Sequence, residues 1–96
     1  MEAIIFCGIQ GAGKSTFYKE HFFKTHVRIS LDLLKTRHRE NMFLQTCFAL
    51  HQPFVVDNTN ATKRERHKYI EKAKAYRFNL KGYYFSYKYY RGIGAK

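Results

Sequence analysis

The chain has 96 residues, enough for one small domain, and its 45% hydrophobic and 26% charged residues are ordinary for a globular protein. This composition excludes intrinsic disorder and collagen-like or low-complexity sequence. The apolar runs are far shorter than the ~20 residues that a membrane-spanning helix needs. The acidic start at Met1-Glu2 does not fit a secretory signal. We therefore expect a single domain over residues 1–96, not associated with a membrane and located in the cytoplasm.

The charge balance points to the class of partner. Eighteen Lys and Arg against seven Asp and Glu give a formal net charge of +11, which favours phosphate-rich partners. A solvated basic surface explains the same excess, and both interpretations stay open. Cys7 and Cys47 stand among apolar neighbours without CxxC spacing, so we expect reduced core residues, not metal ligands or a disulfide.

Apolar runs and helical periodicity alternate along the chain. The predicted strands cover residues 3–7, 27–30, 54–57 and 80–85, and the predicted helices cover residues 14–24, 31–51 with a break near Thr36, and a segment that starts at Thr62. Thr62 and Glu65 have the capping-box spacing. Strands that alternate with helices predict an α/β fold with a mostly parallel sheet covered by helices on both faces.

Periodicity also predicts which helix faces are buried. In the second helix the stripe is Leu44, Cys47 and Phe48, and in the third it is Tyr69, Ala73 and Tyr76. For Tyr83 to Phe85 in the last strand we expect packing in the core.

A glycine-rich loop joins the first strand to the first helix. Residues 8–15 match the pattern G-x-x-x-x-G-K-[ST] at every specified position. Glycines let a loop turn its backbone N–H groups toward a polyphosphate, and the helix that follows adds its positive N-terminal end. Lys14 would reach the β and γ phosphates and the Ser15 hydroxyl would ligate Mg²⁺. The predicted nucleotide-binding residues are Gly8, Gly11, Ala12, Gly13, Lys14, Ser15 and Thr16.

Two aspartates follow strands that should end at the same edge of the sheet. Asp57 ends the third strand, where a carboxylate is placed to hold Mg²⁺ opposite Ser15, although a turn with Asn58 and Thr59 would also explain it. Asp32 follows the second strand. Spacing alone does not decide between a role toward the substrate and a favourable charge at a helix start.

The glycine loop, the Ser30-Leu31-Asp32 segment and Val55-Val56-Asp57-Asn58-Thr59-Asn60 together resemble the kinase domain of the polynucleotide kinase family. That family includes small bacterial ATP-binding proteins, and the likeness covers about residues 3–85. The resemblance implies a P-loop NTPase sandwich with strand order 2-3-1-4, ATP and Mg²⁺ as ligands, Asp32 as the general base toward a 5′-hydroxyl, and Lys35 as the contact to the acceptor phosphate. Arg28 and Arg37 are expected nearby without a matching family role.

The end of the chain departs from the family pattern. Such kinases continue into a lid helix with an arginine and into a fifth strand, whereas residues 86–96 contain only Arg91-Gly92 and Lys96 as a weak match to a lid segment. We expect a shortened or frame-disrupted family member, and the alternative is that Arg91 takes over a reduced lid function. Three interpretations follow: a kinase acting on a polynucleotide end, a kinase acting on the hydroxyl of a small metabolite, and a catalytically silent ATP-binding protein. A missing fifth strand would also leave a sheet edge open to self-association. Tyr87, Tyr89 and Tyr90 beside Lys88 and Arg91 fit either packing or a platform for single-stranded nucleic acid.

Overall fold

The computed structural model describes residues 1–9, 13–60 and 62–85. In this part of the chain, strands and helices alternate as predicted. Their bounds are β1 Glu2–Gly8, α1 Lys14–His21, β2 Val27–Ile29, α2 Leu31–Leu34, α3 Arg37–Leu50, β3 Phe54–Asp57, α4 Lys63–Ala75 and β4 Asn79–Phe85. The strands form one parallel sheet of order β2-β3-β1-β4. The fold class and strand order are thereby confirmed.

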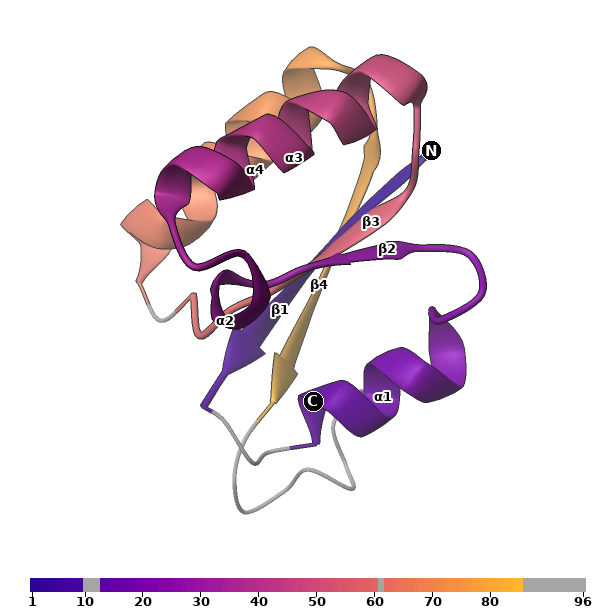
Figure 1. Cartoon of the computed structure of the whole chain (residues 1–96), viewed down its shortest axis with the longest axis vertical. Coiled ribbons are helices and arrows are strands. Elements are labelled where there is room, and N and C mark those ends of the chain that lie inside the picture. The colour runs from indigo at the N-terminus through magenta and orange to yellow at the C-terminus, as the bar shows by residue number, and fades with distance from the viewer. Residues whose placement is uncertain (10–12, 61, 86–96) are drawn as a thin grey trace.

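The sheet is the middle of three layers, with α1 on one face and α3 and α4 on the other (Figure 1). The central strand β1 is buried on both faces. Ile4 and Phe6 pack toward α1, whereas Ala3, Ile5 and Cys7 pack toward α3 and α4. The continuous apolar run in the sequence therefore correctly indicates a strand that is covered on both faces.

The segment expected as one helix with a break is two helices. Lys35 ends α2 with a φ of 76°, and the Thr36 side chain then accepts a hydrogen bond from the Arg39 amide to cap α3. This break lies at the predicted place. Leu44, Cys47 and Phe48 are buried as predicted, and burial raises the pKa of the Cys47 thiol to about 11.

Helix α4 begins with the predicted capping box, in which the Thr62 hydroxyl accepts from the Glu65 amide and the Glu65 carboxylate accepts from the Thr62 amide. Tyr69 and Ala73 are buried, but the prediction for Tyr76 is wrong because its side chain is 50% exposed. Tyr76 caps the end of α4 and stacks on Phe48 from outside, with ring centroids 4.6 Å apart.

At the last strand, Phe85 is buried and Tyr83 packs against the α1 layer, whereas Tyr84 is 64% exposed. Packing is thus confirmed for two of these three aromatics, and the alternation of a strand explains the third. The predictions about a missing lid helix, a missing fifth strand and the aromatic tail concern residues 86–96, which lie outside the described residues. In the described part of the chain, no helix combines the length and apolar character required to cross a bilayer.

Because all described strands are parallel, β1, β2 and β3 end at the same edge of the sheet. The glycine loop, the start of α2 and the segment after β3 leave the sheet there. An open α/β sheet places ligands at this edge, and the candidate site lies there.

Candidate functional site

Helix α1 begins at Lys14, directly after the glycine loop, and its first residues line the candidate pocket. Gly13 takes a left-handed conformation with a φ of 94° and supplies no side-chain cap. The first backbone bond runs from the Phe17 amide to Gly13 O at 3.0 Å. The amides of Lys14, Ser15 and Thr16 therefore precede it and have no acceptor within the helix. This positive helix end fits an anionic group.

The Lys14 ammonium is held over the end of β1. Its Nζ donates to Gly8 O at 2.7 Å and to Asn58 O at 3.1 Å, and lies 3.6 Å from Asp57 Oδ1. The lysine is 8% exposed. The backbone thus fixes a single positive charge at the position where the sequence predicts phosphate contacts.

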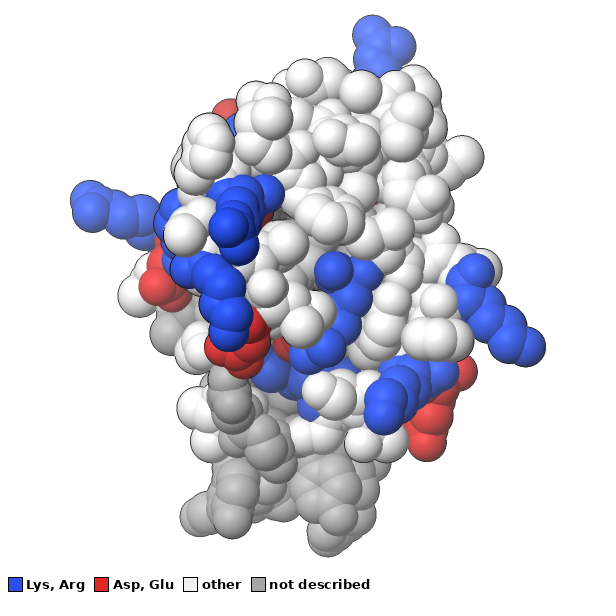
Figure 2. Space-filling model, in the orientation of Figure 1, with Lys and Arg blue, Asp and Glu red and all other residues white. Residues whose placement is uncertain are grey.

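A pocket of about 550 Å³ opens at this edge of the sheet. Its lining includes the predicted residues Gly13, Lys14, Ser15, Thr16, Asp32 and Asp57. Gly8 is not part of the lining but accepts a hydrogen bond from Lys14, whereas Gly11 and Ala12 fall outside the described residues. On the face drawn in Figure 2, Lys and Arg side chains gather around the middle and lower part of the described surface, and the upper part over α3 is mostly uncharged.

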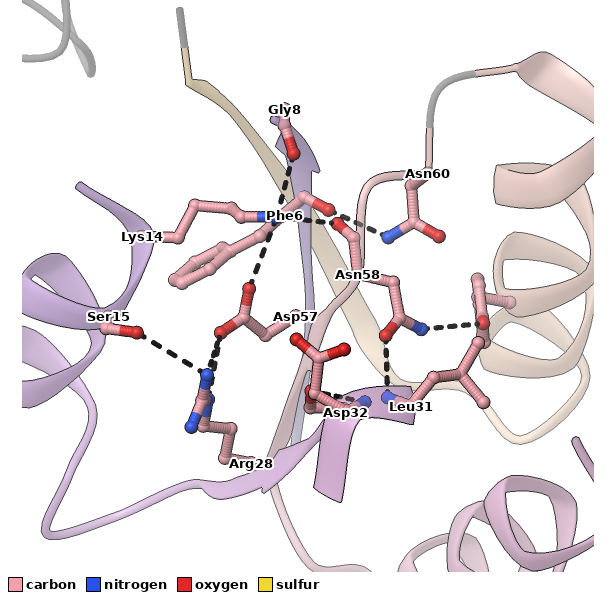
Figure 3. A network of polar contacts seen from close by, with 12 residues as sticks. Phe6, Gly8, Lys14, Ser15, Arg28, Leu31, Asp32, Asp57, Asn58 and Asn60 are labelled. Carbon is pink, nitrogen blue, oxygen red and sulfur yellow. Dashed lines mark hydrogen bonds and ion pairs between the residues drawn. The ribbon is translucent and has the colours of Figure 1, made fainter. Parts of the chain in front are cut away.

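Arg28, on β2, joins the two residues that the sequence predicts for Mg²⁺. Its Nε and Nη2 each lie 2.8 Å from Asp57 Oδ2, and Nη2 lies 3.5 Å from the Ser15 hydroxyl. Figure 3 shows Asp57 between the cationic groups of Lys14 and Arg28. A cation therefore already bridges the hydroxyl and carboxylate oxygens.

Those oxygens suit a hard divalent cation such as Mg²⁺. Within residues 1–9, 13–60 and 62–85, no cluster of three or more His, Cys, Asp or Glu could hold a metal by itself. Mg²⁺ would then be shared between Ser15, Asp57, water and the phosphates of a nucleotide, which is how this ion commonly binds in nucleotide sites. The donor set fits the ion that the sequence predicts.

The segment after β3 is tied to the glycine loop and to β1. The Gly8 amide donates to Thr59 O at 2.9 Å, and Asn60 Nδ2 donates to Phe6 O at 2.8 Å. Asn60 is buried and has a left-handed φ of 48°. The Asp-Asn-Thr-Asn segment, residues 57–60, is therefore hydrogen-bonded to β1 and holds Asp57 close to the glycine loop.

Asp32 enters the pocket from the start of α2. The Ser30 hydroxyl, on the residue before the helix, accepts from the Asp32 amide at 3.2 Å. Lys35 is exposed and does not line the pocket, whereas Arg37 does. The structure thus brings Asp32, Asp57 and Lys14 together and places Lys35 apart from them.

Sequence reasoning missed a buried charged cluster beneath the site. Glu40 is 0% exposed and accepts from Tyr69, Arg37, Lys68 and Asn58. A signal was present, because Glu40 stands one turn before Leu44 on the buried stripe of α3. A carboxylate on such a stripe requires hydrogen-bond partners.

A model of the AAA domain family matches residues 4–88 of this chain. The match covers both the glycine loop and the segment after β3, and it agrees with the parallel sheet and its strand order. The P-loop of this family implies that the chain binds a nucleotide such as ATP. The chain therefore belongs to the AAA domain family of P-loop NTPases.

Proposed function

We propose that this protein is a kinase that binds ATP with Mg²⁺ and transfers the γ-phosphoryl group to a hydroxyl. One observation carries the proposal: Lys14, Asp57 and Asp32 line one pocket at the carboxyl ends of the strands. A phosphate loop alone explains nucleotide binding. A carboxylate on the other side of the pocket, away from the loop, is what transfer to an acceptor additionally needs.

Each residue has a role in this proposal. The α1 amides and Lys14 would hold the β and γ phosphates and offset the charge that develops during transfer. Ser15 and Asp57 would hold Mg²⁺, which neutralises phosphate charge when bound. Asp32 would orient the acceptor hydroxyl and take its proton while the acceptor oxygen bonds to the γ phosphorus and ADP leaves.

The acceptor is the finer part of the proposal. The resemblance to the polynucleotide kinase family and the net charge of +11 favour the 5′-hydroxyl of a nucleic acid. Arg37 would contact an acceptor phosphate in this proposal, which its place in the pocket lining and the 48% exposure of its side chain support. The same role for Lys35 stays a prediction from the resemblance.

The test is a transfer assay with γ-labelled ATP, offering a 5′-hydroxyl oligonucleotide and a panel of small hydroxyl compounds. Asp32→Asn should bind ATP like the parent and transfer at least about 10²-fold more slowly, since a general base contributes 10²–10⁴-fold. Glu71→Gln is the matched control, because this carboxylate is 61% exposed on α4, pairs with His67 and is not part of the pocket lining.

Transfer by Asp32→Asn at the parent rate would contradict the assignment of Asp32. A parent that binds ATP but labels no acceptor would contradict kinase activity and leave nucleotide binding as the function. Labelling of the oligonucleotide that weakens steeply with added salt would identify a nucleic acid acceptor.

A further inference from the structure

The buried carboxylate of Glu40 is the centre of a polar network that joins α3, α4 and the segment after β3. Tyr69 OH donates to Glu40 Oε2 at 2.7 Å and Asn58 Nδ2 donates to the same oxygen at 2.9 Å. Arg37 Nη1 and Lys68 Nζ donate to Oε1 at 3.0 and 3.2 Å. Burial acts to raise the pKa of Glu40, but the hydrogen bonds from Tyr69, Arg37 and Lys68 outweigh it and lower this pKa. Glu40 is therefore a fixed negative charge that can only accept.

This charge sets the orientation of the Asn58 amide. Asn58 Nδ2 must face Glu40 Oε2, since a carboxylate accepts and does not donate, and the same nitrogen lies 3.3 Å from Tyr69 OH. The amide oxygen then faces the other way and accepts from the Leu31 amide at 2.9 Å (Figure 3). The backbone oxygen of Asn58 accepts from Lys14. Asn58 thus connects the buried charge to both sides of the pocket.

The bond to Leu31 reaches the first residue of α2. This helix has only four residues, Leu31–Leu34, and so short a helix does not hold itself in place. At its start it is held by the local Ser30 cap and by the Asn58 contact, which comes from a distant part of the chain. Asp32 is the next residue along the chain.

We propose that Glu40 and Tyr69 are positioning residues that act through Asn58 to hold the start of α2, and with it Asp32, toward the phosphate pocket. The inference rests on the proposed role of Asp32. It extends that role to two buried side chains on α3 and α4 that touch neither nucleotide nor acceptor.

The test compares two identical substitutions at buried tyrosines. Tyr69→Phe removes the hydroxyl that donates to Glu40 and accepts from Asn58 and Arg37, and it keeps the ring in the core. Tyr18→Phe, the matched control on α1, removes a hydroxyl that donates to His26 O on the opposite face of the sheet. We expect Tyr69→Phe to lower kcat about tenfold or more while the affinity for ATP changes less than about twofold, because orientation of reacting groups strongly affects rate. Tyr18→Phe should leave both unchanged.

Hydrogen exchange supplies a readout that needs no acceptor. The Leu31 amide should exchange about tenfold faster in Tyr69→Phe and in the isosteric Glu40→Gln than in the parent and in Tyr18→Phe. Unchanged exchange at Leu31 in both network variants would overturn the proposal, as would an equal kcat loss in Tyr18→Phe. If the parent transfers to no acceptor, the proposed function fails, yet faster exchange at Leu31 would still support the coupling through Asn58.

Discussion

At the scale of single residues, the site is dense in charge, and Lys14, Arg28 and Asp57 form ion pairs within it. The lining holds the basic residues Lys14, Arg28 and Arg37 and the acidic residues Asp32, Asp57 and Glu65. Asp57 meets two of the three cations. Binding of a nucleotide with Mg²⁺ would therefore replace existing ion pairs by new ones. The affinity for the nucleotide depends on the difference in free energy between the two sets of ion pairs.

Arg28 gives the most direct test of that exchange. Its guanidinium lies between the Ser15 hydroxyl and the Asp57 carboxylate, where we propose Mg²⁺. Arg28→Gln should lower the Mg²⁺ concentration for half-maximal ATP binding about fivefold, since a partly exposed ion pair contributes on the order of 1 kcal/mol. Titration of a fluorescent ATP analogue at several Mg²⁺ concentrations measures this change.

Arg28→Lys is the control for charge, because it keeps a cation near Asp57 and should keep the Mg²⁺ requirement close to that of the parent. An unchanged or higher Mg²⁺ requirement in Arg28→Gln would show that this arginine does not compete with the ion.

The residues of the site were predictable from the sequence to different degrees. Lys14 and Asp57 were found because a loop motif and a strand end fix their places in the chain. Arg28 and Arg37 could only be named as neighbours, since their side-chain directions depend on tertiary packing. Glu40 was missed although its place on the buried stripe of α3 gave a signal, because its partners on α4 and after β3 are distant in the chain and no local pattern connects them to it.

At the scale of secondary-structure elements, the end of β1 is held by a close approach to β4. Gly8 pairs in register with Phe85 and has a φ of 140°. A Cβ at position 8 would lie 2.2 Å from Phe85 O. The first glycine of the loop motif is therefore required by the sheet as well as by the loop.

Gly8→Ala should lower the free energy of unfolding by about 2–4 kcal/mol, because overpacking and left-handed strain add. Denaturant unfolding followed by circular dichroism measures the loss. Gly82→Ala on β4 is the matched control, since the nearest atom to its Cβ would be Ile5 O at 3.9 Å, an ordinary contact. Equal stability of the two variants would contradict this account of Gly8.

The order and type of the elements followed from the sequence because hydrophobic periodicity and capping signals are local. Thr62 and Glu65 predicted the start of α4, and the apolar run in β1 predicted a strand covered on both faces. The burial of Tyr76 was mispredicted because periodicity does not report where a helix ends. Tyr76 lies at the cap of α4, beyond the last turn that faces the sheet.

At the scale of the whole molecule, one buried charge joins the layer of helices to the sheet edge. The partners of Glu40 lie on α3, on α4 and after β3. Its pKa is lowered in the folded state. The ionised Glu40 carboxylate therefore stabilises the folded protein at pH values above its pKa in the unfolded chain, near 4.5. This contribution is lost as the pH falls through the lower pKa of the folded state.

Glu40→Gln should therefore unfold more easily at neutral pH, by about 1–3 kcal/mol, because the polar partners lose a charged acceptor. Below pH 4.5 the difference between variant and parent should shrink. Urea unfolding at a series of pH values measures both effects, and Glu71→Gln on the surface of α4 serves as the control. A difference that stays constant from neutral pH to acid would contradict an ionised Glu40.

The central claim is that the loop between β1 and α1 binds a nucleoside triphosphate around the Lys14 ammonium. Isothermal titration of ATP with Mg²⁺ into the parent, Lys14→Ala and Lys19→Ala tests it most directly, since Lys19 stands on the same helix but is exposed. We predict saturable binding at one site in the parent and in Lys19→Ala, and a loss of about 10–100-fold in affinity in Lys14→Ala, as expected for a charged hydrogen bond. Equal ATP affinity in Lys14→Ala and the parent, or no heat of binding in a folded parent, would contradict the account.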